Sequence, residues 1–319
     1  MPANLPQAEV LSVANLSPYF SKPLQAAYAV HQRLHETDPT AFAKIAPRIR
    51  AIAASGESTV SAELIQQLPA LEIISVMGVG YDGIDVAAAK ARAVTVTHTP
   101  GVLDDDVADL AIGLMLSAAR QLPAADRYVR AGSWPSGPMP LARKMSGARL
   151  GLVGMGRIGQ AIAHRAAAFG MQIAYTARSE KAGLSFSYFP SATALAAESD
   201  FLVIITPGGA GTRKLINSEV LAALGTKGIL VNVARGSVVD ETALIDALER
   251  GVIGGAGLDV FESEPNVPER LRAMPQVVLV PHIGSATTQT RQAMADLAFA
   301  NLQAHFSGTA LLSPVPECQ

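Results

Sequence analysis

The chain alternates short apolar runs with longer segments in which apolar residues recur at helical spacing. Over the first hundred residues the strand-like runs are Val10 to Ala14, Ile49 to Ala53, Leu71 to Val76 and Val94 to Thr97. Helical patterns lie between them, around Leu24 to His35, Ser61 to Leu68 and Ile84 to Ala91. This alternation of strands and helices predicts a parallel α/β sheet.

A second α/β series follows a long amphipathic helix, which is predicted to begin at Asp104-Asp105-Asp106 and to run to about Leu122. The acidic start suits the positive end of a helix dipole. The expected strands of this second series lie near 149–153, 172–175, 201–205, 228–233, 255–259 and 277–280. The last helix, about 287–306, comes after the second sheet is complete, so we expect it to cross back to the first lobe.

Two segments match the glycine pattern GxGxxG of a dinucleotide site, at residues 78–83 and 154–159. Context favours the second segment, because a strand precedes it and a full helix follows it. We expect a pyrophosphate at the N-terminus of that helix. In the first segment, the backbone N–H groups of Val79 and Gly80 are candidate donors to a substrate carboxylate. The alternative is that these glycines serve only a tight turn.

The residues after the second expected strand of this series bear on which dinucleotide binds. Thr176 stands where an acidic residue would hold the ribose hydroxyls, and Arg178, Ser179 and Lys181 follow it. A guanidinium and a hydroxyl suit a 2′-phosphate, whereas a carboxylate would repel it. The sequence therefore favours NADP(H), with NAD(H) as the second choice. The alternative is a loop of solvated surface charges.

Three ionisable residues, Arg235, Glu264 and His282, come at or after the ends of expected parallel strands. Ligands of open parallel sheets bind at these ends. Reduction of a 2-oxo acid needs a proton donor for the oxygen and a cation for the carboxylate. His282 suits the first role with Glu264 as its orienting partner, and Arg235 suits the second. Taken singly, each residue has a plain structural alternative.

The composition of the chain indicates which kinds of binding partner to expect. Acidic and basic residues nearly balance, at a net charge of −2, which gives no electrostatic reason to expect nucleic acid or membrane partners. The only cysteine, Cys318, allows no internal disulfide and indicates a reducing compartment. No secretion signal is evident, so we expect a cytoplasmic location. His31 and His35 have metal-ligand spacing on an expected helix, but without further ligands we predict no metal.

With these motifs the sequence resembles the D-isomer-specific 2-hydroxyacid dehydrogenase family over nearly its whole length. The residues that carry the resemblance are Gly154-Met155-Gly156-Arg157-Ile158-Gly159, Asn232 to Gly236, Gly257 to Phe261 with Glu264, and Pro281 to Ser285. Segments 99–103 and 293–297 look most like the glyoxylate, hydroxypyruvate and hydroxyphenylpyruvate reductase branch. Together with the three ionisable residues and with Arg178 and Ser179, the resemblance leads us to expect NADPH-dependent reduction of small 2-oxo acids to D-2-hydroxy acids. Glyoxylate, hydroxypyruvate and aryl pyruvates are the candidate substrates.

The resemblance also implies an α/β fold of two Rossmann-like domains, each a doubly wound parallel sheet. One is a flavodoxin-like substrate-binding domain of residues 1–100 and 287–319. The other is a dinucleotide-binding domain of residues 101–286 that includes a dimerisation segment. A homodimer follows, in which Trp134 is expected to reach the neighbouring subunit's active site; the alternative is that Trp134 packs in its own loop.

Residue by residue, the resemblance carries over two sets of contacts. The implied cofactor contacts are Val107, Gly154, Met155, Gly156, Arg157, Ile158, Gly159, Ala177, Arg178, Ser179, Thr206, Pro207, Thr212, Val233, Ala234, Arg235, Asp259, His282, Gly284 and Ser285. The implied substrate contacts are Val79, Gly80, Trp134, Arg235 and His282.

The chain departs from the family pattern at two places. Asp104 replaces a hydroxyl residue, and the loop from Pro207 to Thr212 is richer in glycine. Two other functions stay open: an NAD-linked phosphoglycerate dehydrogenase, and a non-catalytic dinucleotide-sensing protein of the corepressor kind. The chain shows no basic cluster for a substrate phosphate, and a pure sensor has no need of the three ionisable residues.

Overall fold

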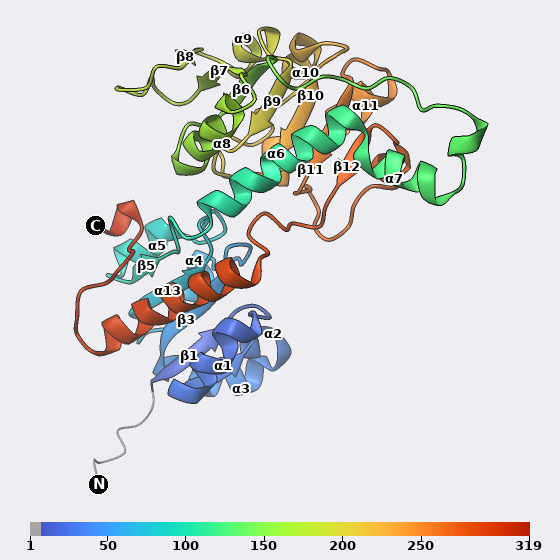
Figure 1. Cartoon of the computed structure of the whole chain (residues 1–319). Coiled ribbons are helices and arrows are strands. Elements are labelled where there is room, and N and C mark those ends of the chain that lie inside the picture. Colours follow the sequence, from blue (N-terminus) through green and yellow to red (C-terminus); the bar gives the residue numbers. More distant parts are fainter. Residues whose placement is uncertain (1–7) are drawn as a thin grey trace. The chain divides into compact units, whose positions relative to one another are not determined.

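The computed structural model of the chain describes residues 8–319 (Figure 1). They form two compact units. The first consists of residues up to Leu103 together with Thr287–Gln319, and the second of Asp104–Ala286. Each unit has its own sheet and its own hydrophobic core, as expected for lobes of this size.

The first unit is built on a five-stranded sheet in the order β2-β1-β3-β4-β5. Its strands are β1 (Glu9–Ser12), β2 (Ala29–Gln32), β3 (Ile49–Ser55), β4 (Ile73–Met77) and β5 (Thr95–Thr97). All neighbouring pairs are parallel. This is the flavodoxin-like strand order, in which ligands bind beyond the carboxyl ends of the strands.

The helices of the first unit include one that comes from the far end of the chain. Helices α1 (Pro18–Ala27), α2 (Leu34–Thr37), α3 (Pro39–Ile45), α4 (Ala62–Gln66) and α5 (Val86–Ala91) precede residue 104, and α13 (Thr288–Phe306) follows the second unit. Short 3-10 turns lie at η1 (Ala46–Arg48) and η4 (Pro316–Cys318). Helix α13 packs against β4 and α1, and buries Met294, Ala298 and Leu302.

The prediction of a helix from Leu24 to His35 is wrong. Helix α1 ends at Ala27, and β2 occupies Ala29–Gln32, where it pairs in parallel with β1. As an edge strand, β2 keeps every side chain at least partly exposed, so it lacks the apolar pattern that identifies a strand. His31 therefore lies in a strand and His35 in α2, and the two do not share a helix.

The second unit is built on a seven-stranded parallel sheet in the order β12-β11-β10-β9-β6-β7-β8. Its strands are β6 (Arg149–Val153), β7 (Gln172–Thr176), β8 (Ser187–Tyr188), β9 (Phe201–Ile204), β10 (Ile229–Asn232), β11 (Gly255–Leu258) and β12 (Val277–Leu279). The order reverses between β6 and β9, which is the switch point of a doubly wound sheet. The predicted fold class, α/β with two parallel sheets, is confirmed.

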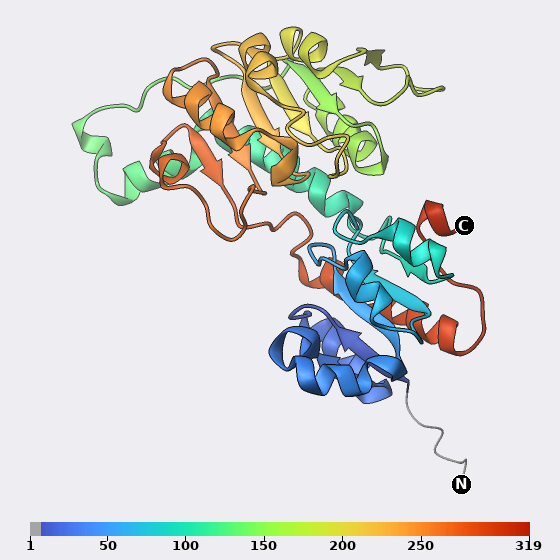
Figure 2. The same ribbon diagram turned by 180° about the vertical axis from the view of Figure 1, so that it is seen from behind.

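Helices cover both faces of the second sheet (Figures 1 and 2). They are α6 (Asp104–Arg120), α7 (Leu122–Arg130), α8 (Arg157–Ala167), α9 (Ala192–Ala197), α10 (Ser218–Leu224), α11 (Glu241–Glu249) and α12 (Glu269–Ala273), with 3-10 turns η2 (Trp134–Ser136) and η3 (Gly236–Val238). Helix α6 packs against β10, β11 and α8, while α9, α10 and α11 share a buried cluster with the strands.

A charged contact joins α6 to α8. Arg165 on α8 binds Asp105 at 2.9 Å and Asp109 at 2.5 Å, both on α6. The sequence pattern extended α6 to Leu122, whereas the helix ends at Arg120 and α7 begins two positions later after the left-handed residue Gln121. Across residues 8–319 no helix is long and apolar enough to span a membrane.

Candidate active site

The glycine turn after β6 lies against the end of β9. Gly154 has a φ of +114°, and a Cβ there would come within 2.7 Å of the carbonyl oxygen of Ile205. A Cβ on Gly159 would come within 2.6 Å of the carbonyl oxygen of Gly154. Both positions therefore need glycine, the first for its backbone conformation and both for close packing. The turn sits at the switch point of the sheet.

The same turn leaves room for a ligand. A Cβ on Gly156 would meet no atom of the protein within 4 Å. Gly156 is also the N-cap of α8, with no side-chain cap, and no acidic residue stands in the first turn of that helix. The backbone N–H groups at this helix end are thus available to an anion, and the residues present fit the pyrophosphate of a dinucleotide.

Two loops flank the glycine turn. Gly154 donates its N–H to the carbonyl oxygen of Thr176, so the end of β7 adjoins the turn. Arg178 and Ser179 follow that strand end and are exposed. On the other side, the loop after β9 begins at Thr206, which is half-buried, and is closed by a hydrogen bond of 2.7 Å from Thr212 Oγ1 to the carbonyl oxygen of Pro207.

Arg235 is placed by the turn that follows β10. The amide of Asn232 donates to the carbonyl oxygen of Arg235 at 3.0 Å and accepts from the N–H of Ala234 at 3.0 Å. Gly236 lets this turn approach the segment after β11, because a Cβ there would lie 1.9 Å from the carbonyl carbon of Phe261. The close approach brings the half-buried Arg235 toward the Glu264 loop.

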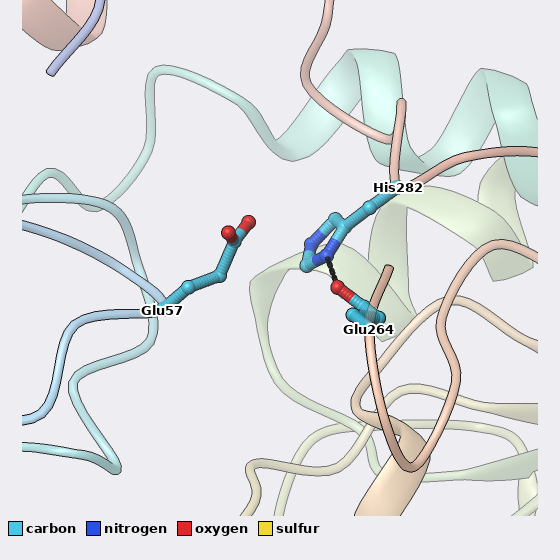
Figure 3. A group of neighbouring side chains, drawn as sticks. All are labelled: Glu57, Glu264 and His282. Atoms are coloured by element: carbon cyan, nitrogen blue, oxygen red, sulfur yellow. Dashed lines mark hydrogen bonds and ion pairs between the residues drawn. The ribbon is translucent and has the colours of Figure 1, made fainter. Parts of the chain in front are cut away.

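Glu264 and His282 form a hydrogen-bonded pair (Figure 3). His282 Nδ1 lies 2.7 Å from Glu264 Oε2, and the other carboxylate oxygen, Oε1, accepts the N–H of Phe261 at 2.9 Å. The side chains of His282 and Glu264 are 26% and 28% exposed, so the pair is only partly withdrawn from solvent.

A buried carboxylate holds the loop that carries His282. Asp259, 2% exposed at the end of β11, accepts the N–H groups of Ile283 at 2.6 Å and Gly284 at 2.9 Å. The N–H of His282 donates to the carbonyl oxygen of Asp259 at 2.8 Å. These bonds keep His282 at a φ of +52°, which is uncommon for a residue with a side chain.

The two carboxylates differ in their electrostatics. Burial pushes the pKa of Glu264 upward, but the His282 and Phe261 hydrogen bonds and the charge of Arg235 outweigh it, so this pKa lies below its ordinary value. For Asp259, burial dominates and raises the pKa above its ordinary value, against the two backbone donors. Glu264 is therefore the carboxylate that stays charged beside the imidazole.

The comparisons with known proteins agree with this geometry. Residues 112–284 match the family profile "D-isomer specific 2-hydroxyacid dehydrogenase, NAD binding domain". A hydroxyphenylpyruvate reductase of Plectranthus scutellarioides is 46% identical over 307 residues, which cover 96% of this chain and 98% of the relative. The chain belongs to the D-isomer-specific 2-hydroxyacid dehydrogenase family.

Two further relatives of this family are similar over most of their length. A glyoxylate/hydroxypyruvate reductase of Arabidopsis thaliana is 50% identical over 267 residues, covering 84% of this chain and 85% of the relative. The crystal structure of an NADPH-dependent glyoxylate/hydroxypyruvate reductase from Sinorhizobium meliloti, in complex with NADP and malonate, matches with a TM-score of 0.92 at 45% identity and covers 98% of each chain.

The implied cofactor contacts all lie in the second unit of this family member. Val107 on α6 packs against Gly284, where a Cβ would lie 3.4 Å from Val107 Cγ2. Met155, Val233, Ala234 and Asp259 are buried around the turn and strand ends, whereas Arg157 and Pro207 are exposed, and Ile158, Ala177 and Ser285 are half-buried. Trp134 lies in η2 and is 67% exposed.

The side chain of Asn232, which shapes the Arg235 turn, had no role predicted from the sequence. Asn232 is 1% exposed and closes a strand that is otherwise apolar. A polar amide at the buried end of such a strand needs hydrogen-bond partners. This need could have indicated from the sequence that Asn232 holds a neighbouring turn. Val79 and Gly80 lie in the first unit, in the loop after β4.

The lowered pKa of Glu264 predicts how its contribution to stability varies with pH. Because the folded-state pKa lies below the ordinary value of 4.5, the carboxylate stabilises the fold fully above that value and loses the effect as pH falls through the folded pKa. We expect Glu264→Gln to lower the free energy of unfolding at pH 7, with a difference that shrinks below pH 4.5.

Urea unfolding of both proteins between pH 7 and pH 3 measures this difference. Glu180→Gln, at an exposed position after β7, controls for the loss of one surface charge. A difference between wild type and Glu264→Gln that stays constant over the whole range would contradict the prediction.

Proposed function

We propose that the protein reduces small 2-oxo acids, glyoxylate and hydroxypyruvate first among them, to D-2-hydroxy acids with NADPH. The hydrogen bond between His282 and Glu264 is the observation that carries the proposal. It provides an oriented proton donor at the carboxyl ends of parallel strands, the edge at which ligands of such sheets bind. The reductases named above, 45% to 50% identical, support the same substrate class.

The imidazole supplies the proton. With Nδ1 bonded to Glu264, Nε2 is the nitrogen that hands a proton to the carbonyl oxygen of the substrate. The charged carboxylate of Glu264 stabilises the imidazolium before the transfer and fixes the ring orientation. In the reverse direction the same nitrogen takes the hydroxyl proton. The bound dihydronicotinamide supplies the hydride to the carbonyl carbon.

The guanidinium supplies a fixed positive charge. The planar guanidinium of Arg235 can bind a carboxylate by two parallel hydrogen bonds. In this role it binds the substrate and polarises the carbonyl next to the carboxylate, so that negative charge developing on the oxygen is stabilised. Its own backbone is held by Asn232, which limits how far the anchor moves.

We expect wild-type protein to oxidise NADPH in the presence of glyoxylate or hydroxypyruvate. His282→Asn removes the proton donor and should lower kcat by about 10²- to 10⁴-fold, the usual range for general acid–base catalysis. The matched control is His164→Asn, an exposed histidine on α8, which should keep kcat. Steady-state absorbance at the NADPH band measures both.

Two results would overturn this proposal. Folded wild-type protein that turns over none of these acids with either dinucleotide would remove the enzymatic role and favour the sensing alternative. A clear preference for a phosphorylated 2-oxo acid with NADH would favour the phosphoglycerate dehydrogenase alternative.

NADPH preference rests on the loop after β7. Position 176, where an acidic side chain would repel a 2′-phosphate, is a threonine. Arg178 and Ser179 are exposed in the same loop and offer the phosphate a guanidinium and a hydroxyl. The Sinorhizobium meliloti reductase, which is NADPH-dependent and binds NADP, supports the same choice. Lys181 is close to this loop, since its N–H donates to Tyr175 Oη at 2.7 Å.

Arg178→Ala should raise the KM for NADPH and leave the KM for NADH unchanged. Hydrogen bonds to charged groups contribute about 1.5–3 kcal/mol, so the expected rise is on the order of ten- to a hundredfold. Arg272→Ala, at an exposed arginine on α12, is the control and should change neither value. Equal effects on both dinucleotides would contradict a phosphate-specific role.

We also propose that the protein is a homodimer that uses the segment from α7 to residue 141. Leu122, Val129, Trp134 and Leu141 are 49%, 56%, 67% and 103% exposed, and no residue of α7 is buried. In both ribbon views this segment extends away from the sheet of its own unit (Figures 1 and 2). Apolar side chains gathered in this way are typical of an interface.

Light scattering should give twice the chain mass of 33.1 kDa for the wild type. Val129→Asp places a charge on the exposed apolar face of α7 and should shift the mass toward that of the monomer. Leu312→Asp, at a 57% exposed leucine in the first unit, is the control and should leave the mass unchanged. A wild type of monomer mass at micromolar concentration would refute the dimer.

A further inference from the structure

The loop Gly78–Gly83, which follows β4 in the first unit, presents two neighbouring backbone donors. Val79 and Gly80 are only half-buried. Neither N–H has an acceptor in the backbone or side chains of residues 8–319. Most backbone N–H groups that are withdrawn from water find a partner in the protein. Two adjacent donors without one are available to an anion such as a carboxylate.

The carbonyl groups of the same residues are held by the two residues that follow β5. The N–H of Thr99 donates to the carbonyl oxygen of Gly78 at 2.8 Å. His98 Nδ1 lies 3.0 Å from the carbonyl oxygen of Val79. Since a carbonyl oxygen can only accept, Nδ1 carries the hydrogen and the imidazole is the donor.

Because the carbonyl groups of Gly78 and Val79 are held, the directions of the N–H groups that follow them are also fixed. A trans peptide is planar, so its C=O and the following N–H point in opposite directions. Holding the Gly78 oxygen fixes the N–H of Val79, and holding the Val79 oxygen fixes the N–H of Gly80. Both N–H groups are thereby turned away from His98 and Thr99.

The C-terminal segment, residues 312–318, holds His98 in place. The N–H of His98 donates to the carbonyl oxygen of Ser313 at 3.1 Å, and Ser313 Oγ donates to the carbonyl oxygen of His98 at 2.6 Å. Ser313 is held in turn by Asn301, which is fully buried on α13 and both donates to Ser313 Oγ and accepts the Ser313 N–H. A continuous chain of hydrogen bonds thus runs from α13 to the loop.

A second contact braces the imidazole from the loop itself. The ring of Tyr81 meets that of His98 edge to face, with centroids 5.2 Å apart and an interplanar angle of 86°. Tyr81 Oη donates to Glu317 Oε2 at 3.1 Å, in the C-terminal segment. Burial, together with the charge of Glu317, raises the pKa of Tyr81 to about 12, so the hydroxyl remains a donor.

We propose that His98 is a positioning residue, held by the C-terminal segment, which aims the N–H groups of Val79 and Gly80 at the carboxylate of the 2-oxo acid. The inference rests on the proposed function, because the anion it assigns to this loop is that substrate's carboxylate. His98 acts through the peptide plane of Val79 and Gly80 and does not itself touch the substrate.

The test compares His98→Ala with His98→Asn. Loss of one hydrogen bond that positions the loop should raise the KM for glyoxylate by about three- to tenfold, with kcat within about twofold, since the lost interaction binds substrate and transition state alike. The KM for NADPH should not change. The dissociation constant of oxamate, the unreactive amide analogue, should rise by the same factor in calorimetry with NADP⁺ present. The amide of His98→Asn can donate to the Val79 carbonyl and should restore most of the affinity.

His31→Ala is the matched control, because His31 lies on β2 at the opposite edge of the same sheet and binds Glu9 there. It should leave the KM and the oxamate affinity unchanged. If His98→Ala does not fold, Tyr81→Phe removes only the bond to Glu317 and should still raise the KM and weaken oxamate binding by a smaller factor.

Failure of this inference is distinguishable from failure of the proposed function. If the wild-type protein reduces neither glyoxylate nor hydroxypyruvate, the proposed function is wrong. An active wild type whose His98→Ala or Tyr81→Phe variant binds glyoxylate and oxamate equally well overturns the positioning role, as does an equal rise in KM for His31→Ala or a failure of His98→Asn to restore affinity. Thermal unfolding of each variant identifies a change that is only structural, because stability would then fall without the KM and the oxamate affinity moving.

Discussion

The chemistry proposed for the second unit depends on one buried carboxylate, that of Asp259. It holds two backbone N–H groups after His282, and its own carbonyl oxygen holds the N–H of His282. A left-handed backbone costs a residue with a side chain roughly 1–2 kcal/mol. An ordinary hydrogen bond contributes about 0.5–1.5 kcal/mol, so the bonds around Asp259 together are enough to offset that cost. The position of the imidazole, and hence its bond to Glu264, follows from this anchor.

The sequence could predict where the proposed catalytic residues lie, because the carboxyl ends of parallel strands share one edge of a sheet. Arg235, Glu264 and His282 follow β10, β11 and β12, which are neighbours in that sheet. It could not predict how they are held. The Asn232 and Asp259 bonds depend on the paths of loops between strands, and those paths are set by contacts between distant residues. The edge strand β2 was missed for the same reason, since its pairing with β1 decides its conformation and its own side chains carry little pattern.

The two glycine patterns illustrate the difference between a motif and its surroundings. A Cβ on Gly78 would lie 2.6 Å from the Cα of Gly56, and a Cβ on Gly83 would lie 2.3 Å from the carbonyl oxygen of Ser58. Both glycines are therefore required by close packing against a neighbouring turn of the first unit. In the second unit, Gly156 has open space beside it and begins an 11-residue helix, whereas the first pattern leads only to the 6-residue α5. The glycine pattern alone indicates only that the backbone passes close to other atoms. The length of the helix that follows favours a phosphate site at the second pattern over the first.

The groups proposed to hold a carboxylate in the first unit do not titrate, unlike the proton donor proposed in the second unit. The backbone amides of Val79 and Gly80 keep their N–H across the neutral range, so the hold proposed for them on a carboxylate should vary little with pH. The proton transfer proposed for the second unit, by contrast, uses His282, whose partner Glu264 has a pKa below its ordinary value. A positioning residue such as His98, which acts only through a peptide plane, alters how tightly the acid is held and leaves the proton-transfer machinery intact.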